Sequence, residues 1–209
     1  MKKEYLLYKL YDHSKKRVHI NNELFEKYNV KRGLRNEDGT GVLVGLTNVG
    51  DVVGYEKNKN GKVHPIDGKL YYRGYDLKDI TKDILQSKRF GYEEICYLLL
   101  SGKLPDMERL KCFKEIINEN MYLDKKTIMH IIDLEGQNIM NILSRSVLEM
   151  YIHDPNPEDM SLENLMLQSI RLIARFPAVI AYAYNMYHYS VFHKYLNIIL
   201  PKTKYSIAE

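Results

Sequence analysis

The strongest constraint on the fold is a helical pattern that runs from Asp76 to about Tyr189. Apolar residues recur there every three or four positions, and capping or helix-breaking residues separate the segments. Gly102 and Pro105, for example, end one of them. The pattern predicts a mainly α-helical fold with helices at Asp76 to Ile84 or Leu85, Glu93 to Leu100, Asp106 to about Asn120, a short one from Asp124, Ile139 to Tyr151 and Leu162 to Tyr189.

Several residues of these helices carry specific expectations. Pro177 lies inside the last helix, and we expect it to kink or split that helix because proline removes a backbone hydrogen bond. Glu93 and Glu94 stand at a helix start, where the helix dipole and solvation explain a pair of carboxylates. Candidate core residues on one face of the third helix are Leu110, Phe113 and Ile117.

A short helical arm is predicted for residues 1–32. A helix is expected from Asn21 to Tyr28, with Asn21 or Asn22 as its N-cap. Earlier in the arm, the residues that share one helical face are Leu6, Leu7, Leu10 and Tyr11.

Residues 33–75 are rich in glycine and poor in helix formers, which predicts a small β-hairpin region. The remainder, 76–209, is the helical portion. Within the hairpin region the predicted features are strands at Val42–Thr47 and Val52–Tyr55 with a turn at 48–51, a hairpin tip at 58–61, a turn at Asp67-Gly68 and a strand-like run at Lys69–Tyr75.

The net charge of +4 is unevenly placed, because residues 1–35 carry an excess of lysine and arginine. A basic arm suits nucleic acid, an anionic membrane or a polyanionic ligand, and the alternative is a solvated helix face. No pattern of stacking aromatics or groove-reading helix accompanies it, so we expect no nucleic-acid partner. Uninterrupted apolar runs are only a few residues long, so we expect no membrane partner.

Cysteine usage and the start of the chain favour a cytoplasmic protein. The two cysteines, Cys96 and Cys112, do not make a secreted disulfide framework. Cys96 lies in an apolar run and is expected to be a buried small hydrophobe. The first residues lack a long apolar segment followed by a small-residue cleavage site.

The residues alone predict no self-sufficient active site. The seven histidines lack metal-ligand spacing, so no metal site is expected. Neither a nucleophile elbow nor a phosphate-binding glycine loop is present in the sequence. At the end, Ser206 and Glu209 have capping-box spacing, which predicts a helix that begins where the chain stops, and we therefore expect a truncated chain.

Several runs, in order, resemble the citrate synthase family from about Lys31 onward. The most specific are the Tyr-Arg-Gly-Tyr-Asp run at 72–76 and the run at 93–105, Glu-Glu-Ile-Cys-Tyr-Leu-Leu-Leu-Ser-Gly-Lys-Leu-Pro. The runs at Gly33–Arg35, Asp67–Asp76, Phe90–Pro105, Asn138–Leu143 and Ile173–Tyr182 complete the resemblance. It implies the N-terminal half of a nearly all-helical large domain.

The resemblance implies an acyltransferase of the tricarboxylic acid cycle that condenses acetyl-CoA with oxaloacetate to give citrate and CoA, without a cofactor. In the family, histidines and an aspartate act in motifs of the types Asp/Glu-His-x-x-x-x-Ser/Thr, Gly-Pro-Leu-His-Gly and Gly-x-Gly-His-Arg-x-Tyr. None of these occurs in this sequence. We therefore assign no catalytic residue and expect the isolated chain to be inactive.

The resemblance also implies a homodimer, because the helices that match Leu162 onward lie at the family's dimer interface. Apolar residues around much of the same stretch indicate that it needs covering: Phe176, Val179, Ile180, Tyr182, Ala183 and Met186.

Arg35 is the one candidate binding residue. In some family members the arginine of a matching Gly-x-Arg run contacts the phosphates of CoA, and a guanidinium suits phosphate because it offers a planar fork of donors. Lys31 and Arg32 would add positive potential. The alternative is that Arg35 caps carbonyls or pairs with Glu37 or Asp38.

Two alternatives remain for the function. The family often has His-Pro-Met-x-x-Leu-Arg where this sequence has Asn138 to Ser144, and the missing histidine, proline and arginine indicate a divergent branch. A 2-methylcitrate synthase, which uses propionyl-CoA, is therefore one alternative. The other is a non-catalytic binding or dimerisation module that keeps the helical scaffold.

Overall fold

The computed structural model describes residues 12, 21–28, 30, 33–35, 40–134, 136–197 and 205–208. The chain forms two compact units, Met1–Thr47 and Asn48–Glu209. The divisions expected at 32–33 and 75–76 stay predictions. The predicted helical face at residues 6–11 lies outside the described residues.

The first unit contains helix α2, Asn22–Lys27, which confirms the short helix expected there. The side-chain oxygen of Asn21 accepts a hydrogen bond from the N–H of Glu23 at 3.1 Å, as an N-cap residue does. The strand predicted at Val42–Thr47 is wrong, because these residues adopt no regular structure. Gly41, just before it, forms an isolated bridge with Arg35, and none of the residues from Val42 to Thr47 belongs to a strand of the described sheet.

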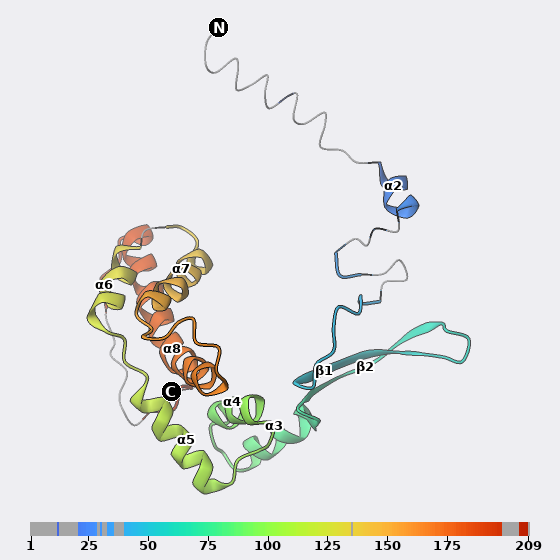
Figure 1. Ribbon diagram of the computed structural model, residues 1–209, viewed down its shortest axis with the longest axis horizontal. Coiled ribbons are helices and arrows are strands. Elements are labelled where there is room, and N and C mark those ends of the chain that lie inside the picture. Colours follow the sequence, from blue (N-terminus) through green and yellow to red (C-terminus); the bar gives the residue numbers. More distant parts are fainter. Residues whose placement is uncertain are drawn as a thin grey trace. The chain divides into compact units, whose positions relative to one another are not determined.

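The second unit begins with a three-stranded antiparallel sheet of order β1-β2-β3. Its strands are β1, Gly50–Lys57, β2, Val63–Tyr72, and β3, Tyr75–Asp76 (Figure 1). The predicted hairpin tip is confirmed: the side chain of Asn58 accepts from the N–H groups of Asn60 and Lys62 at 3.0 and 2.9 Å. The turn predicted at 48–51 is displaced, since Gly50 and Asp51 already belong to β1.

The predicted turn at Asp67-Gly68 is wrong, because both residues lie inside β2. Val53 pairs with Lys69 and Tyr55 with Pro65, so residues 66–68 face the single residue Gly54. The turn-forming residues therefore produce an irregularity in a continuing strand, because the strand pairs with β1 on both sides of them.

Arg73 and Gly74 make the tight turn between β2 and β3, with φ values of 51° and 87°. The guanidinium of Arg73 donates to the carbonyl of Leu99 at 2.7 and 3.1 Å and to Asn48 at 2.8 Å. The Tyr-Arg-Gly-Tyr-Asp run thus holds the sheet to the end of the second helix of this unit.

The helical portion confirms the mainly α-helical fold, with each predicted helix present and only its ends shifted by a few residues. Asp76, Asp106, Asp124, Asn138 and Ser161 cap helices with their side chains, and Gly102 ends one at φ 84°. The helices are α3, Leu77–Gln86, α4, Tyr92–Ser101, α5, Met107–Glu119, α6, Lys125–Asp133, α7, Ile139–Ile152, and α8, Leu162–Phe192.

Helix α8 is the centre of the packing and contributes to both hydrophobic clusters (Figure 1). It runs as one helix through Pro177, so the expected split does not occur, and the kink that was the other expected outcome stays a prediction. The first cluster joins α8 to α6 and α7 through Ile131, Ile142, Met150, Val179, Tyr182 and Ala183. The second joins it to α5 through Phe113, Ile117, Met121 and Ala174.

The chain itself covers part of the apolar surface of α8. Of the six residues expected to need covering, Val179, Tyr182, Ala183 and Met186 are buried. Helix α8 is also the one described helix that is long and apolar enough to cross a membrane by length and composition, a test that core helices of soluble proteins pass as well. Part of the apolar surface that stays open to solvent is a stripe with i, i+4 spacing, in which Phe176 is half-buried and the other three residues are exposed. We call it the α8 stripe: Leu172, Phe176, Ile180 and Tyr184.

Candidate functional site

The described histidines are spread over the fold. His64 lies in β2, and His188 and His193 lie at the end of α8. Among the described residues, no three His, Cys, Asp or Glu side chains gather as metal ligands would. His13 and His19 lie outside the described residues.

Two histidines share one carboxylate between α6 and α7. Glu149 lies 3.7 Å from the Nε2 atoms of both His130 and His153. Burial raises the pKa of nearby Asp124, but hydrogen bonds from Thr127 and the charge of His153 outweigh it and hold that pKa below its ordinary value. Asp124 uses its carboxylate to cap α6, so this cluster stabilises a helix start.

Glu93 and Glu94 are buried residues, at 2% and 8% exposure, so the expected solvation of this pair is wrong. Glu94 pairs with Arg89, whose Nε lies 2.9 Å from the carboxylate. Hydrogen bonds to Glu94 and then Asp83 raise the pKa of the Arg89 guanidinium. Burial of both carboxylates requires such partners.

Glu93 binds a part of the chain that is remote in sequence. Its Oε1 accepts hydrogen bonds from the hydroxyl of Ser206 and the N–H of Ile207, both at 2.7 Å. Ser206 in turn accepts from the N–H of Ala208 at 3.2 Å, while Glu209 lies outside the described residues. Ile207 packs against the second cluster, so Glu93 fixes residues 206–208 to α4.

Replacing Glu93 by glutamine is expected to lower the free energy of unfolding by about 1 kcal/mol. Glutamine keeps an acceptor oxygen but turns two charge-assisted hydrogen bonds into neutral ones, which are weaker by about this amount. Urea unfolding followed by circular dichroism measures the change. Ser206→Ala should add little in the Glu93→Gln background if the two residues act together, and full additivity would separate them.

Cys96 is half-buried and Cys112 is exposed. Burial raises the pKa of the Cys96 thiol, which keeps it protonated. This agrees with the expected role of Cys96 as a small hydrophobic residue beside the second cluster.

Arg35 lies in the first unit and is exposed. Its backbone pairs with Gly41, and Gly33 before it has a φ of 68°, a conformation that favours glycine. Lys31, Arg32, Glu37 and Asp38 lie outside the described residues, so neither the expected potential around Arg35 nor its expected pairing is tested.

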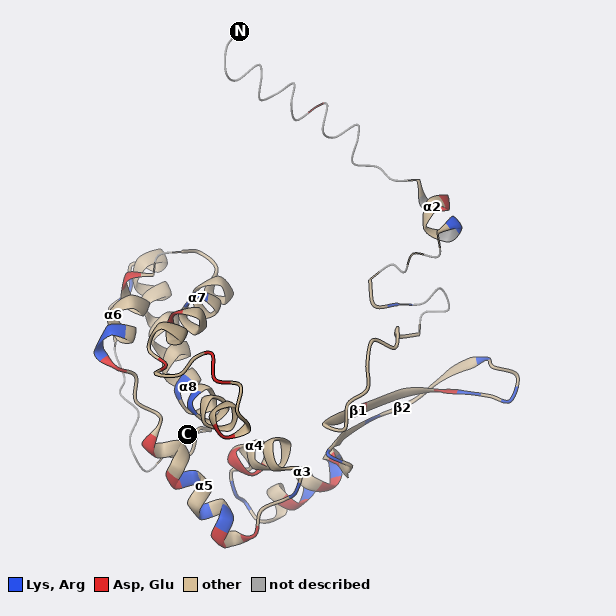
Figure 2. Ribbon diagram, viewed as in Figure 1, with Lys and Arg blue, Asp and Glu red and all other residues tan. Residues whose placement is uncertain are grey.

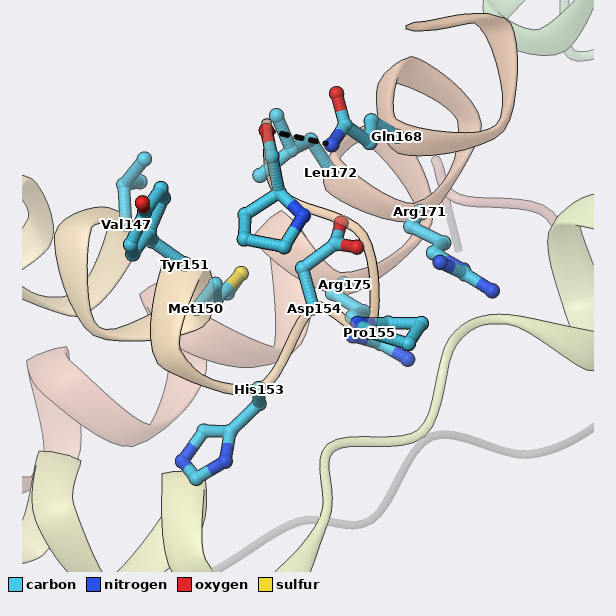
Figure 3. A pocket seen from close by; sticks show the side chains of 11 residues that line it. Val147, Met150, Tyr151, His153, Asp154, Pro155, Gln168, Arg171, Leu172 and Arg175 are labelled. Carbon is cyan, nitrogen blue, oxygen red and sulfur yellow. Dashed lines mark hydrogen bonds between the residues drawn. The ribbon is translucent and has the colours of Figure 1, made fainter. Parts of the chain in front are cut away.

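A cavity of about 310 Å³ opens between α7, the loop after it and α8 (Figure 3). Arg171 and Arg175 line it from α8, and Asp154 lines it from the loop. This site was not predicted from the sequence, although the i, i+4 spacing of two arginines on an apolar helix is a visible signal. The remaining lining residues are Val147, Met150, Tyr151, His153, Pro155, Pro157, Gln168 and Leu172.

Comparison with known proteins identifies the family. A family model described as "Citrate synthase, C-terminal domain" matches residues 38–209. Citrate synthase 2 of Bacillus subtilis is 29% identical over 69% of this chain and 36% of its own length. 2-Methylcitrate synthase 1 of Corynebacterium glutamicum is 31% identical over 57% of this chain and 30% of its own length. The chain thus spans about a third of the length of these relatives.

Solved structures show the same fold. Citrate synthase from Pyrobaculum aerophilum aligns with a TM-score of 0.61 at 21% identity, over 80% of this chain and 39% of that one. A citrate synthase from Thermotoga maritima aligns with a TM-score of 0.56 at 23% identity, over 85% of this chain and 39% of that one. Since the family model covers well over half of the residues, this chain belongs to the citrate synthase family.

Proposed function

We propose that this chain is part of a citrate synthase that condenses acetyl-CoA with oxaloacetate to give citrate and free CoA, in the tricarboxylic acid cycle. The observation that carries the proposal is the family match over residues 38–209. A related structure supports the substrates: citrate synthase from Thermoplasma acidophilum, at 20% identity, a TM-score of 0.58 and covering 77% of this chain and 37% of that one, holds carboxymethyl coenzyme A and oxaloacetate. Acetyl-CoA enters as a substrate, and the reaction uses no cofactor.

We place the catalytic acid and base outside this chain. Condensation requires a group that removes a proton from the acetyl methyl and groups that polarise the oxaloacetate carbonyl. The three histidine motifs of the family are absent from the sequence. His130 and His153, which face Glu149, stand beside the cap of α6 and offer no such arrangement.

A 2-methylcitrate synthase is the second candidate. The relative from Corynebacterium glutamicum supports it, as does the divergent run from Asn138 to Ser144. Here Asn138 caps α7 with its side chain, which accepts from the N–H of Asn141 at 3.1 Å. A coupled assay of CoA release by a longer protein that contains this chain, with acetyl-CoA and propionyl-CoA compared, separates the two activities, and release with neither favours a non-catalytic module.

The proposal includes a homodimer in the cytoplasm. The exposed α8 stripe supports the dimer, because a row of apolar residues along the central helix is a surface that a second copy can cover.

Arg35→Ala in the longer protein is expected to raise the Michaelis constant for acetyl-CoA about tenfold, as the loss of one charged phosphate contact does. The Michaelis constant for oxaloacetate should change little. Steady-state kinetics with each substrate varied in turn measure both. Arg109→Ala, at an exposed arginine on α5, is the matched control. An unchanged acetyl-CoA constant removes Arg35 from the site.

A further inference from the structure

The cavity between α7 and α8 holds two arginines that have no partner. Arg171 and Arg175 are the only lysine or arginine residues of α8 and form its blue segment in Figure 2. Neither guanidinium has a hydrogen bond or ion pair with any residue in the described part of the chain. The Nε of Arg175 is buried as well as unpartnered.

Two other arginines of the same unit have hydrogen-bond partners for their guanidinium groups. Arg89 bonds to Glu94 and Asp83, and Arg73 donates to the carbonyl of Leu99. The contrast is physical, because a buried N–H without an acceptor costs about 1–3 kcal/mol and like charges at i, i+4 repel. Arg175 carries the first cost through its buried Nε, and the pair together carries the second on the same cavity wall.

The charged residues that line the cavity carry a net positive charge. Asp154 is its only acidic residue, and its carboxylate already accepts the N–H of Asn156 at 2.9 Å. In Figure 3 both guanidinium groups lie on the side of the cavity where Pro155 lies, and His153 points away from them. The amide of Gln168 is directed to the carbonyl of Pro157, so it does not neutralise either arginine.

The rest of the cavity wall is apolar. Val147, Met150 and Leu172 supply apolar surface, with the ring of Tyr151 beside them. A cavity of about 310 Å³ with such a wall and two guanidinium groups on its lining has the size and chemistry of a small-molecule site. The two arginines are forks of donors that match the oxygens of a phosphoryl or carboxylate group.

We propose that this cavity binds a small organic anion, whose phosphoryl or carboxylate group lies between Arg171 and Arg175 and whose apolar body lies against Val147 and Leu172. The oxygens of the bound anion would accept hydrogen bonds from the unpartnered N–H groups, and its negative charge would offset the repulsion between the two guanidinium groups. The site uses none of the residues assigned to the condensation reaction, so it stands whether or not that function is correct.

Titration calorimetry and thermal unfolding of the whole chain with phenyl phosphate, benzoate, inorganic phosphate and phenol test the site. Phenyl phosphate or benzoate is expected to bind and to raise the melting temperature. Whichever binds more tightly identifies the charged group. Inorganic phosphate and phenol, which each lack one half of the proposed ligand, should bind at least tenfold more weakly.

Arg171→Gln and Arg175→Gln should each weaken binding of the tighter organic anion about tenfold, since each removes a charge-assisted contact. Arg175→Lys, which keeps the charge and loses the fork, should bind with intermediate affinity. Arg109→Gln, on exposed α5, should bind as the unchanged chain does. Absence of binding by both organic anions, or equal affinity in all of these variants, would overturn the proposal.

Discussion

A coupled assay with acetyl-CoA and oxaloacetate is expected to detect no CoA release by the 209-residue chain. A positioned general acid or base contributes about 10²–10⁴-fold to a rate, and loss of both together with the carbonyl-polarising group leaves only the background reaction. The chain contains none of the three histidine motifs that carry these groups in the family. Release should therefore equal that of a sample without protein.

Citrate synthase 2 of Bacillus subtilis, measured in the same assay, is the positive control. Far-ultraviolet circular dichroism should show that the inactive chain is folded and mainly helical. Oxaloacetate-dependent release above the blank would contradict the expectation. In that case His130→Gln and His153→Gln would show whether the pair around Glu149 supplies the missing groups.

The helices could be predicted from the sequence because their signals are local. Asp76, Asp106 and Asp124 each precede an apolar repeat, and each caps the helix that follows it. A cap acts within three residues of its own position, so no remote contact is needed to place the helix start. Only the ends of the helices shifted, as they commonly do.

The strands were harder to predict because pairing is not local. Val42–Thr47 has strand-like composition but no partner strand, and residues 43, 44 and 46 are exposed. Asp67-Gly68 has turn-like composition, yet the hairpin tip after Lys57 extends the ladder past it. In both places the outcome depends on what lies across the sheet, which composition does not specify.

The candidate sites show the same limit. Glu93 accepts a hydrogen bond from Ser206, 113 residues away in the sequence, so no local sequence pattern predicts the contact. The family resemblance predicts Arg35 as a binding residue. Arg171 and Arg175 are identified as a candidate site by the cavity that they line, which the sequence does not show. Their spacing was visible, but an arginine pair on a helix is usually solvated or paired, and burial of the Nε of Arg175 is what distinguishes this one.

The chain is expected to form a dimer at micromolar concentration, with a mass near twice 24.7 kDa by light scattering. The α8 stripe is the surface we expect a second copy to cover, since its residues alternate with core residues on the helix that organises the unit. Ile180→Lys or Tyr184→Lys would place a charge in that contact, which costs several kcal/mol unless the charge is paired. Each should weaken dimerisation at least a hundredfold.

Tyr189→Lys is the matched control, because Tyr189 and Tyr184 lie on the same helix and are each 50% exposed. They are five positions apart, which is about 140° around a helix, so Tyr189 faces away from the α8 stripe. The control variant should keep the dimer mass, while Tyr184→Lys should give the monomer mass with unchanged circular dichroism. A monomeric unmodified chain would contradict the prediction. Equal loss of the dimer in both variants would show that the α8 stripe is not the dimer contact, because lysine at position 189 alters solubility and charge by the same amount as lysine at position 184.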